Sequence, residues 1–163
     1  MKTLELYFRI VSKEDAASFL KWQYTEPYQV YNYDPKRFEE DLAYHINPKN
    51  NLYSIYLDGE LAGYCSFGHD AQVPGGDYSL EAMDIGLMIK PEITGQGQGG
   101  KFAADVIQYG IALNKPKTLR VTIADFNKRA MRVWEKQGFE RIQEFERTHD
   151  KSKFVILTRQ AEV

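Results

Sequence analysis

The stretch 91–101, with the sequence Pro-Glu-Ile-Thr-Gly-Gln-Gly-Gln-Gly-Gly-Lys, has the composition of a phosphate-binding turn. Glycine has no Cβ, so the backbone can approach an anion closely, and the first N–H groups of a helix have no intrahelical partners. Those N–H groups and the positive end of the helix dipole bind phosphate oxygens. The glycines between positions 95 and 100 therefore predict a turn that holds a phosphate group.

Two nucleotide-binding motifs fit this turn incompletely. Gly95-x-Gly97-x-x-Gly100 matches the dinucleotide pattern, but the stretch 114–118 has no acidic residue where that pattern requires one. The same glycines followed by Lys101 match a P-loop, but Phe102 stands where Ser or Thr would bind magnesium. A magnesium-dependent nucleotide-binding protein is therefore disfavoured.

A third motif is supported by a second segment further along the chain. Thr94-Gly95-Gln96-Gly97-Gln98-Gly99 resembles the acetyl-CoA turn of the GNAT superfamily of N-acetyltransferases, Gln/Arg-x-x-Gly-x-Gly/Ala, with Thr94 in the first position. The stretch 127–139 resembles that superfamily's Asn-x-x-Ala-x-x-x-Tyr-Glu-Lys-x-Gly-Phe segment, except that Trp134 replaces the tyrosine. The two motifs occur in the expected order and spacing, and they identify the chain as similar to this superfamily.

The elements that must position these motifs follow the order of the GNAT fold. Alternating or continuous apolar runs predict strands, apolar residues at helical spacing predict helices, and Asp58-Gly59 predicts a hairpin turn. The fold class is α/β (α+β), and the resemblance implies a mixed, mostly antiparallel sheet of about seven strands with about four helices, in which the parallel fourth and fifth strands splay apart. The expected strands are 4–10, 53–57, 61–67, 81–90, 118–124, 139–146 and 153–158, and the expected helices are 12–22, 34–46, 102–113 and 127–138. Ser12 and Asn127 are expected to cap helices and Gly138 to end the last one. The bend Pro74-Gly75-Gly76 is expected to be exposed. The expected apolar faces of the second and third helices are Phe38, Leu42 and Ile46, and Phe102, Val106, Tyr109, Gly110 and Leu113.

Length and composition indicate a single domain over residues 1–163. A net charge of −2, with acidic and basic residues mixed along the sequence, does not indicate a nucleic-acid-binding surface, so no nucleic-acid partner is expected. The chain has no apolar run long enough to span a bilayer and no signal-peptide pattern at its start, so we expect a cytoplasmic protein without a membrane partner.

Neither cysteine nor histidine chemistry is expected. Cys65 is the single cysteine and lies in an apolar run, which predicts a packed core thiol rather than a nucleophile. His45, His69 and His149 lack the close spacing of metal ligands, so no metal is expected.

The resemblance implies acetyl-CoA as co-substrate and a set of residues that would hold it. Backbone groups of Leu87, Met88 and Ile89 would run beside the pantetheine, with one N–H stabilising the oxyanion of a tetrahedral intermediate. The turn Thr94–Gly100 would hold the pyrophosphate through the N–H groups of Gln96, Gly97, Gly99 and Gly100. Asn127 would bind the pantetheine amides or simply cap the following helix.

Two carboxylates are candidates for the base that deprotonates the acceptor amine. By resemblance, Glu81 and Asp84 lie on the strand where such bases are often found. Their separation of three residues places them on opposite faces of a regular strand, so only one would point at the substrate unless a bulge intervenes. Glu81 is favoured over Asp84, and a solvated or ion-paired role is the alternative for each.

Trp134 occupies the position of the tyrosine that commonly protonates the leaving thiolate in the superfamily. An indole N–H donates a hydrogen bond but has no proton to give at useful pH. Expelling a thiolate of pKa about 8.5 unprotonated at pH 7 costs only roughly 2 kcal/mol, so the loss of this acid slows the reaction without preventing it. Trp134 would contact the pantetheine or be a plain core residue.

The expected reaction is acetyl transfer from acetyl-CoA to a primary amine of a small molecule or a protein N-terminus by direct attack. The tyrosine-rich segment 24–33 and the loop 70–77 would border the acceptor, where acidic and aromatic side chains can receive a cationic amine. A non-catalytic acyl-CoA-binding or sensing module is the alternative. Dimers are common in the superfamily, so a homodimer is compatible with the resemblance.

Overall fold

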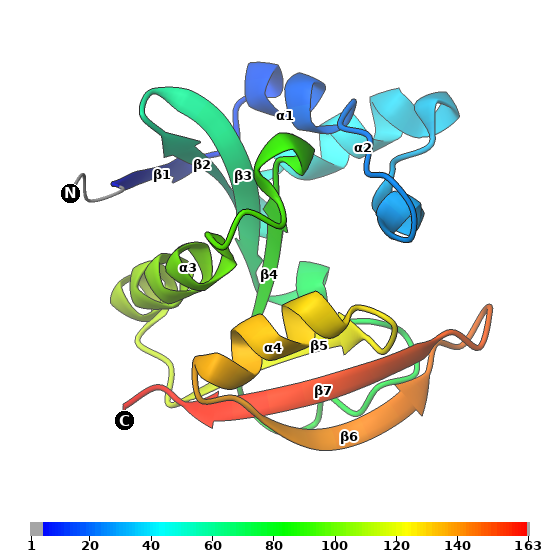
Figure 1. The fold of residues 1–163 in the computed structure, drawn as a ribbon, viewed down its shortest axis with the longest axis vertical. Coiled ribbons are helices and arrows are strands. Elements are labelled where there is room, and N and C mark those ends of the chain that lie inside the picture. The colour runs from blue at the N-terminus through cyan, green and yellow to red at the C-terminus, as the bar shows by residue number, and fades with distance from the viewer. Residues whose placement is uncertain (1–4, 163) are drawn as a thin grey trace. The chain divides into compact units, whose positions relative to one another are not determined.

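The computed structural model describes residues 5–162. The first strand is predicted to begin at Leu4, and that residue lies outside the described residues. The chain forms two compact units (Figure 1). The first contains the chain up to Cys65 together with Leu87–Gln98, and the second contains Ser66–Gly86 and the chain from Gly99 onward. Each unit thus collects segments that are far apart in the sequence, and each is described by itself below.

The first unit contains the N-terminal strands and two helices. Strand β1 (Leu6–Ile10) pairs antiparallel with β2 (Leu52–Leu57), and β3 (Glu60–Phe67) follows β2. Helix α1 is Lys13–Phe19, and the 3-10 turns η1 (Tyr28–Tyr31) and η2 (Pro35–Arg37) lead to α2 (Phe38–Ile46) and η3 (Pro48–Asn50). Side chains from both helices and from the strands share one core, made by Val11, Ala16, Phe19, Leu20, Leu42, Leu52 and Tyr64.

Local signals in the sequence explain where these elements begin and turn. The Ser12 hydroxyl accepts the Asp15 N–H at 3.1 Å and so caps α1, as the sequence predicted. Asp58 and Gly59, with φ values of 51° and 82°, make the predicted hairpin between β2 and β3. Cys65 is 1% exposed and is the packed thiol that was expected, and burial raises the pKa of that thiol.

The second helix differs from the prediction in which residues it buries. Leu42 is buried as expected, but Ile46, predicted on the same apolar face, is 38% exposed. His45 is buried instead, at 5% exposure, with its ring edge-on to Phe19. Apolar periodicity does not predict the burial of His45, because a histidine whose two ring nitrogens are hydrogen-bonded can be buried like an aromatic residue.

A buried carboxylate joins α1 to the first two strands. Asp15 is 4% exposed, accepts hydrogen bonds from Ser54 Oγ at 2.7 Å and from the Tyr56 hydroxyl, and forms an ion pair with Arg9 at 3.2 Å. Burial raises the pKa of Asp15, but the hydrogen bonds from Tyr56, Ser54 and Arg9 outweigh burial and hold that pKa below its usual value. The ionised carboxylate is therefore the form that stabilises the fold.

The hydrogen bonds and the ion pair of Asp15 predict that the fold loses stability in acid, and that Asp15→Asn reduces this loss. Because the pKa of Asp15 is lower in the folded state, its stabilisation is complete above the unfolded-state pKa of about 3.9 and is lost as pH falls through the folded-state pKa. Asp15→Asn is expected to lower the free energy of unfolding by about 1–3 kcal/mol at pH 7 and to flatten its decline in acid. Urea unfolding between pH 7 and pH 3 measures both effects.

Glu14→Gln is the matched control, because Glu14 is an exposed carboxylate in the same helical turn. It should leave both the stability at pH 7 and the acid decline close to those of the wild type. An equal change in both variants would contradict the assigned role of Asp15.

The second unit contains the two longer helices and the C-terminal strands. Helices α3 (Gly99–Asn114) and α4 (Lys128–Lys136) belong to this unit with strands β5 (Thr118–Ala124), β6 (Glu140–Glu146) and β7 (Lys153–Gln160). Strand β7 pairs antiparallel with both β5 and β6, and α4 lies over these strands (Figure 1). The bounds of β5 and of the C-terminal strands agree with the prediction to within two residues.

Helix α3 packs closely at one glycine. Phe102, Val106 and Gly110 are buried as predicted, but Leu113 is 46% exposed, because the apolar stripe turns away from the protein before the last turn of the helix. A Cβ on Gly110 would lie 2.5 Å from Phe67 Cε1. The sequence argument placed Gly110 on the apolar face, and the short approach explains why no larger residue fits there.

Strand β4 (Met83–Ile89) connects the two units through the chain itself, since the division falls between Gly86 and Leu87. The described strands form one seven-stranded sheet in the order β1-β2-β3-β4-β5-β7-β6. β4 and β5 run parallel, as expected, with the pairs Met83–Leu119 and Asp84–Arg120 in the second unit. The predicted mixed, mostly antiparallel sheet with four α-helices is confirmed for the residues that the structure describes.

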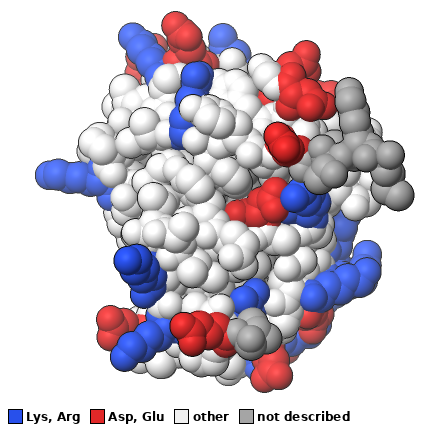
Figure 2. All heavy atoms as spheres, turned by 90° about the vertical axis from the view of Figure 1, so that its left-hand side faces the viewer, with Lys and Arg blue, Asp and Glu red and all other residues white. Residues whose placement is uncertain are grey.

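The mixed distribution of charge on the surface and the hydropathy of the helices agree with what the composition predicts. Basic and acidic side chains are interspersed on the face that Figure 2 shows, and neither sign dominates it. Within residues 5–162, no helix has the length and apolar character needed to cross a bilayer.

Candidate functional site

The glycine-rich turn begins after a short 3-10 turn, η5 (Pro91–Ile93), and leads into α3. Gly95 and Gly97 have φ values of 77° and 79°, in the left-handed region that favours glycine. Both are exposed together with Gln96, and a Cβ on Gly97 would meet nothing within 4 Å. Glycine is needed here for the left-handed backbone conformation rather than for close packing. The backbone of the turn is therefore open to an approaching ligand.

Two further features at this turn concern its last residues. Gln98 Oε1 is buried and has no hydrogen-bond partner among the described residues. In the second unit, a Cβ on Gly99 would lie 3.1 Å from Val133 Cγ2, so α3 begins in close contact with α4. The N–H groups of Gly99 and Gly100 open α3, where a helix has N–H donors without intrahelical partners.

The residues predicted to run beside the pantetheine are the end of β4 in the first unit. A Cβ on Gly63 would lie 2.6 Å from the Met88 carbonyl oxygen, and Lys90 N donates to the Ala62 carbonyl at 2.7 Å, so this stretch packs closely on β3. The Tyr24 hydroxyl donates to the Ile89 carbonyl at 2.7 Å. Burial raises the pKa of Tyr24, which therefore keeps its proton at neutral pH.

The predicted base Asp84 is a buried ion-pair partner in the second unit. It is 2% exposed, and Arg120 donates from Nε to Oδ1 at 2.6 Å and from Nη2 to Oδ2 at 2.8 Å. Gln72 Nε2 donates to Oδ2 at 2.9 Å. Both carboxylate oxygens are therefore held by donors, and Asp84 is poorly placed to accept a proton from a substrate.

The other predicted base, Glu81, lies outside β4 and not on it. It is exposed, directly before the strand, and its carboxylate has no ion-pair partner within the part of the chain that the structure describes. The strand begins only at Met83, so Glu81 and Asp84 do not lie on one regular strand. Their expected placement on opposite faces of such a strand therefore does not apply.

The loop that precedes Glu81 is fixed at several points within the second unit. The Leu80 carbonyl accepts from Arg120 Nη1 at 2.7 Å, and the Tyr78 hydroxyl accepts from Val73 N at 2.9 Å. Thr148 N donates to the Pro74 carbonyl at 3.0 Å. A Cβ on Gly75 would lie 2.5 Å from the Glu146 carbonyl oxygen. Pro74 and Gly75 are exposed, as predicted, while the backbone of this bend packs against the hairpin between β6 and β7.

Asn127 and Trp134 lie at the start and in the middle of α4. The Asn127 side chain accepts from Ala130 N at 3.0 Å, which confirms the predicted cap, and Gly138, at φ 93°, follows the helix in the left-handed conformation. Trp134 is 6% exposed and lies edge-on to Phe139, with ring centroids 5.3 Å apart. This packing is a sufficient structural reason for a large aromatic residue at that position.

Sequence reasoning missed the partners of these residues. Arg120 sits in an alternating strand pattern, which suggests a solvent-facing side chain, although a buried arginine requires a buried acid and Asp84 lies on a strand of the same sheet. Ser66 Oγ is buried without a hydrogen-bond partner among the described residues, and a Cβ on Gly86 would lie 2.6 Å from it. Nothing in the sequence marks Ser66, because it reads as part of an apolar strand.

Comparisons with known proteins agree with this arrangement. The model of the acetyltransferase (GNAT) family matches residues 14–139. A search of curated protein sequences finds no match.

Three solved structures illustrate the similarity in fold. An uncharacterized protein from Bacillus halodurans has a TM-score of 0.80 at 23% identity, covering 98% of this chain and 86% of that one. A chimera of the spermidine N-acetyltransferase from Vibrio cholerae and hSSAT has 0.74 at 15%, covering 96% and 95%. Aminoglycoside acetyltransferase AAC(6')-Ib in complex with coenzyme A has 0.74 at 17%, covering 96% and 95%.

The family model spans more than half of the chain, and it includes both the glycine-rich turn and the segment from Asn127 to Phe139. The chain belongs to the acetyltransferase (GNAT) family.

Proposed function

We propose that this protein transfers the acetyl group of acetyl-CoA to a primary amine. The observation that carries the proposal is the turn at Gly95 and Gly97, whose left-handed, exposed backbone leads directly into α3 in a chain of this family. Exposed N–H groups at the start of a helix bind phosphate oxygens. Support for the donor also comes from the similarly folded aminoglycoside acetyltransferase, which was solved with coenzyme A.

The residues present fit acetyl-CoA as the donor substrate. The N–H groups of Gln96 and Gly97 in the turn, and of Gly99 and Gly100 in α3, would hold the pyrophosphate. Gln98 Oε1, buried without a partner in the described chain, is an acceptor for a ligand hydrogen-bond donor or an ordered water. Leu87, Met88 and Ile89 would offer backbone groups to the pantetheine, and Asn127 is a further candidate contact. Bound acetyl-CoA supplies an activated thioester.

Glu81 would serve as the base, acting directly or through a water molecule. It is exposed and unpaired among the described residues, whereas Asp84 is held by Arg120 and Gln72. A lysine-like amine of pKa near 10.4 costs roughly 4.6 kcal/mol to deprotonate at pH 7, so a positioned base contributes substantially to the rate.

Trp134 would not protonate the leaving thiolate. Its indole has no titratable proton at useful pH, and its burial against Phe139 gives it a packing role. A coenzyme A thiolate can leave unprotonated at a cost of only roughly 2 kcal/mol at pH 7, so water suffices as the eventual proton donor.

The test of this function is the release of free thiol from acetyl-CoA over a panel of amines, amino acids, aminoglycosides and peptides with free N-termini. Turnover with one class of amine, confirmed by the mass of the acetylated product, supports the proposal. Tight binding of acetyl-CoA without turnover on any of these amines would instead support a non-catalytic sensing module.

A matched pair of glycine substitutions separates cofactor binding from folding. Gly97 and Gly59 have φ values of 79° and 82°, and a Cβ at either position meets nothing within 4 Å. Alanine at each position should therefore cost a similar amount of stability, about 1–2 kcal/mol, from backbone strain alone. We expect only Gly97→Ala to raise the KM for acetyl-CoA, by about tenfold, which corresponds to about 1.4 kcal/mol.

Steady-state kinetics and urea unfolding of the two variants measure these effects. If Gly59→Ala raised the KM as much as Gly97→Ala, the effect would report on folding, and the turn would lose its assigned role.

A further inference from the structure

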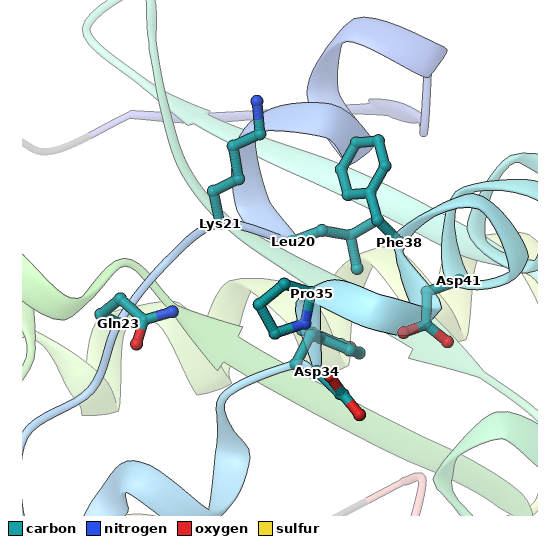
Figure 3. A pocket seen from close by; sticks show the side chains of 8 residues that line it. Leu20, Lys21, Gln23, Asp34, Pro35, Phe38 and Asp41 are labelled. Atoms are coloured by element: carbon teal, nitrogen blue, oxygen red, sulfur yellow. The ribbon is translucent and has the colours of Figure 1, made fainter.

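A pocket of about 410 Å³ opens within the first unit, between the end of α1 and the start of α2 (Figure 3). This volume lies in the range of roughly 300–1,000 Å³ that is typical of small-molecule sites. Its apolar wall is made by Leu20, Pro35 and Phe38. The pocket is therefore large enough, and apolar enough, to hold a short alkyl chain.

The charged side chains of the pocket favour a cation. Asp34 and Asp41 contribute two carboxylates, and Lys21 contributes one ammonium group. The Lys21 ammonium lies over the Phe38 ring, 5.6 Å from its centroid, and points away from both carboxylates (Figure 3). Asp34 uses Oδ1 to accept the Lys36 N–H at 3.0 Å, which leaves its second oxygen for a ligand.

The walls of the pocket are held in place from below. Tyr33 and Phe38, which line the pocket, pack against the core of the first unit. The Tyr33 hydroxyl lies 3.1 Å from His45 Nε2 and 2.7 Å from the Tyr64 hydroxyl. The opposite ring nitrogen of His45 donates to the Asp41 carbonyl at 2.6 Å. This buried chain fixes the backbone of Asp41 and the position of Tyr33, so the pocket is a formed feature rather than a gap between mobile side chains.

One residue of the pocket precedes a tyrosine that is hydrogen-bonded to the strand expected to run beside the pantetheine. Gln23 lines the pocket, and the next residue, Tyr24, donates its hydroxyl to the Ile89 carbonyl at the end of β4. Tyr24 N also donates to Asn32 Oδ1 at 2.7 Å, which ties the two ends of the segment 24–32 together. Gln23 of the pocket thus belongs to a segment that is hydrogen-bonded to the predicted pantetheine strand.

We propose that this pocket binds the protonated end of the acceptor, and that the acceptor is a linear alkyl amine with at least two amino groups. Carboxylates close to an ammonium group favour its charged form, so an amine held by Asp34 and Asp41 is protonated and cannot attack a thioester. The attacking amine must therefore be a second group on the same molecule, joined by an alkyl chain that suits the apolar wall. This inference rests on the proposed function.

The first test measures binding of the amine separately from its acetylation. Calorimetric titration with 1,4-diaminobutane, 1,8-diaminooctane and n-butylamine, without acetyl-CoA, compares the wild type with Asp34→Asn, Asp41→Asn and the double variant. Asparagine at position 34 retains the cap on Lys36 N. We expect each single variant to weaken diamine binding by about tenfold, and we expect n-butylamine to occupy the pocket without being acetylated.

Asp58→Asn is the control, because Asp58 is an exposed carboxylate of the same unit at a φ of 51°, a conformation that asparagine also adopts. It removes the same charge away from the pocket and should leave binding unchanged. Undetectable diamine binding in the wild type, wild-type affinity in the Asp34 and Asp41 variants, or equal weakening by Asp58→Asn would each overturn the proposal.

Different results would contradict the cation site in the pocket and the proposed acetyltransferase reaction. Thiol release that continues with an unchanged KM for the diamine in the double variant would leave the acetyltransferase intact and remove the pocket from it. Diamine binding that depends on Asp34 and Asp41 without any thiol release would establish the cation site and contradict the proposed reaction.

Discussion

Replacing Arg120 with methionine is expected to lower the free energy of unfolding by about 3–5 kcal/mol. Arg120 and Asp84 are each 2% exposed and are joined by two hydrogen bonds of 2.6 and 2.8 Å. Removing the guanidinium leaves a buried carboxylate whose one remaining donor among the described residues is the Gln72 amide, and it also removes the donor to the Leu80 carbonyl. Urea unfolding at pH 7 measures the loss.

Two further variants identify the cause. In Arg120→Met with Asp84→Leu neither charge of this pair remains, so much of the lost stability should return. Arg37→Met breaks the Arg37–Glu40 ion pair, whose side chains are 60% and 71% exposed, and should cost at most about 1 kcal/mol. A double variant as unstable as Arg120→Met alone would show that the other contacts of Arg120, its bond to the Leu80 carbonyl and its stacking 4.9 Å from the Tyr78 ring centroid, determine the loss.

The sequence predicted those parts of the fold that local chemistry determines. Ser12, the Asp58-Gly59 turn, Asn127 and Gly138 each specify a cap or turn within a few residues, and each was placed correctly. The glycine-rich turn was recognisable for the same reason, since its signal is a run of glycines between two periodic segments. Such features depend on short-range geometry that the order of residues contains.

Features that depend on distant partners were not predictable in this way. Asp84 was a candidate base because the resemblance places such bases on this strand, and only the pairing of β4 with β5 brings Arg120 opposite it. His45 in α2 and Tyr33 in the segment before it form a partly buried pair, and Tyr24 reaches Ile89 over 65 residues of chain. A hydrogen-bonding side chain carries no sequence signal for the identity of its partner, so the pocket near Tyr33 was not anticipated.

Glu81→Gln is expected to reduce kcat by about 10²–10⁴-fold while leaving the free energy of unfolding nearly unchanged. Glu81 is exposed and makes no ion pair in the described chain, so its removal leaves no buried charge unpaired. Asp84→Asn is the contrasting variant, because it removes the acid partner of Arg120 and should act mainly on stability. Thiol-release kinetics and urea unfolding of both variants distinguish a base from a structural carboxylate.

The dependence on the amine and on pH tests the role of Glu81 more directly. An alkyl amine of pKa near 10.4 costs roughly 4.6 kcal/mol to deprotonate at pH 7, and an α-amine of pKa near 8 costs only about 1.4 kcal/mol, so Glu81→Gln should impair turnover of the alkyl amine far more. Without the base, kcat/KM should rise about tenfold for each pH unit up to the pKa of the amine, because only the neutral fraction reacts. An equal loss for both amines at every pH would remove Glu81 from proton transfer and leave it a role in binding alone.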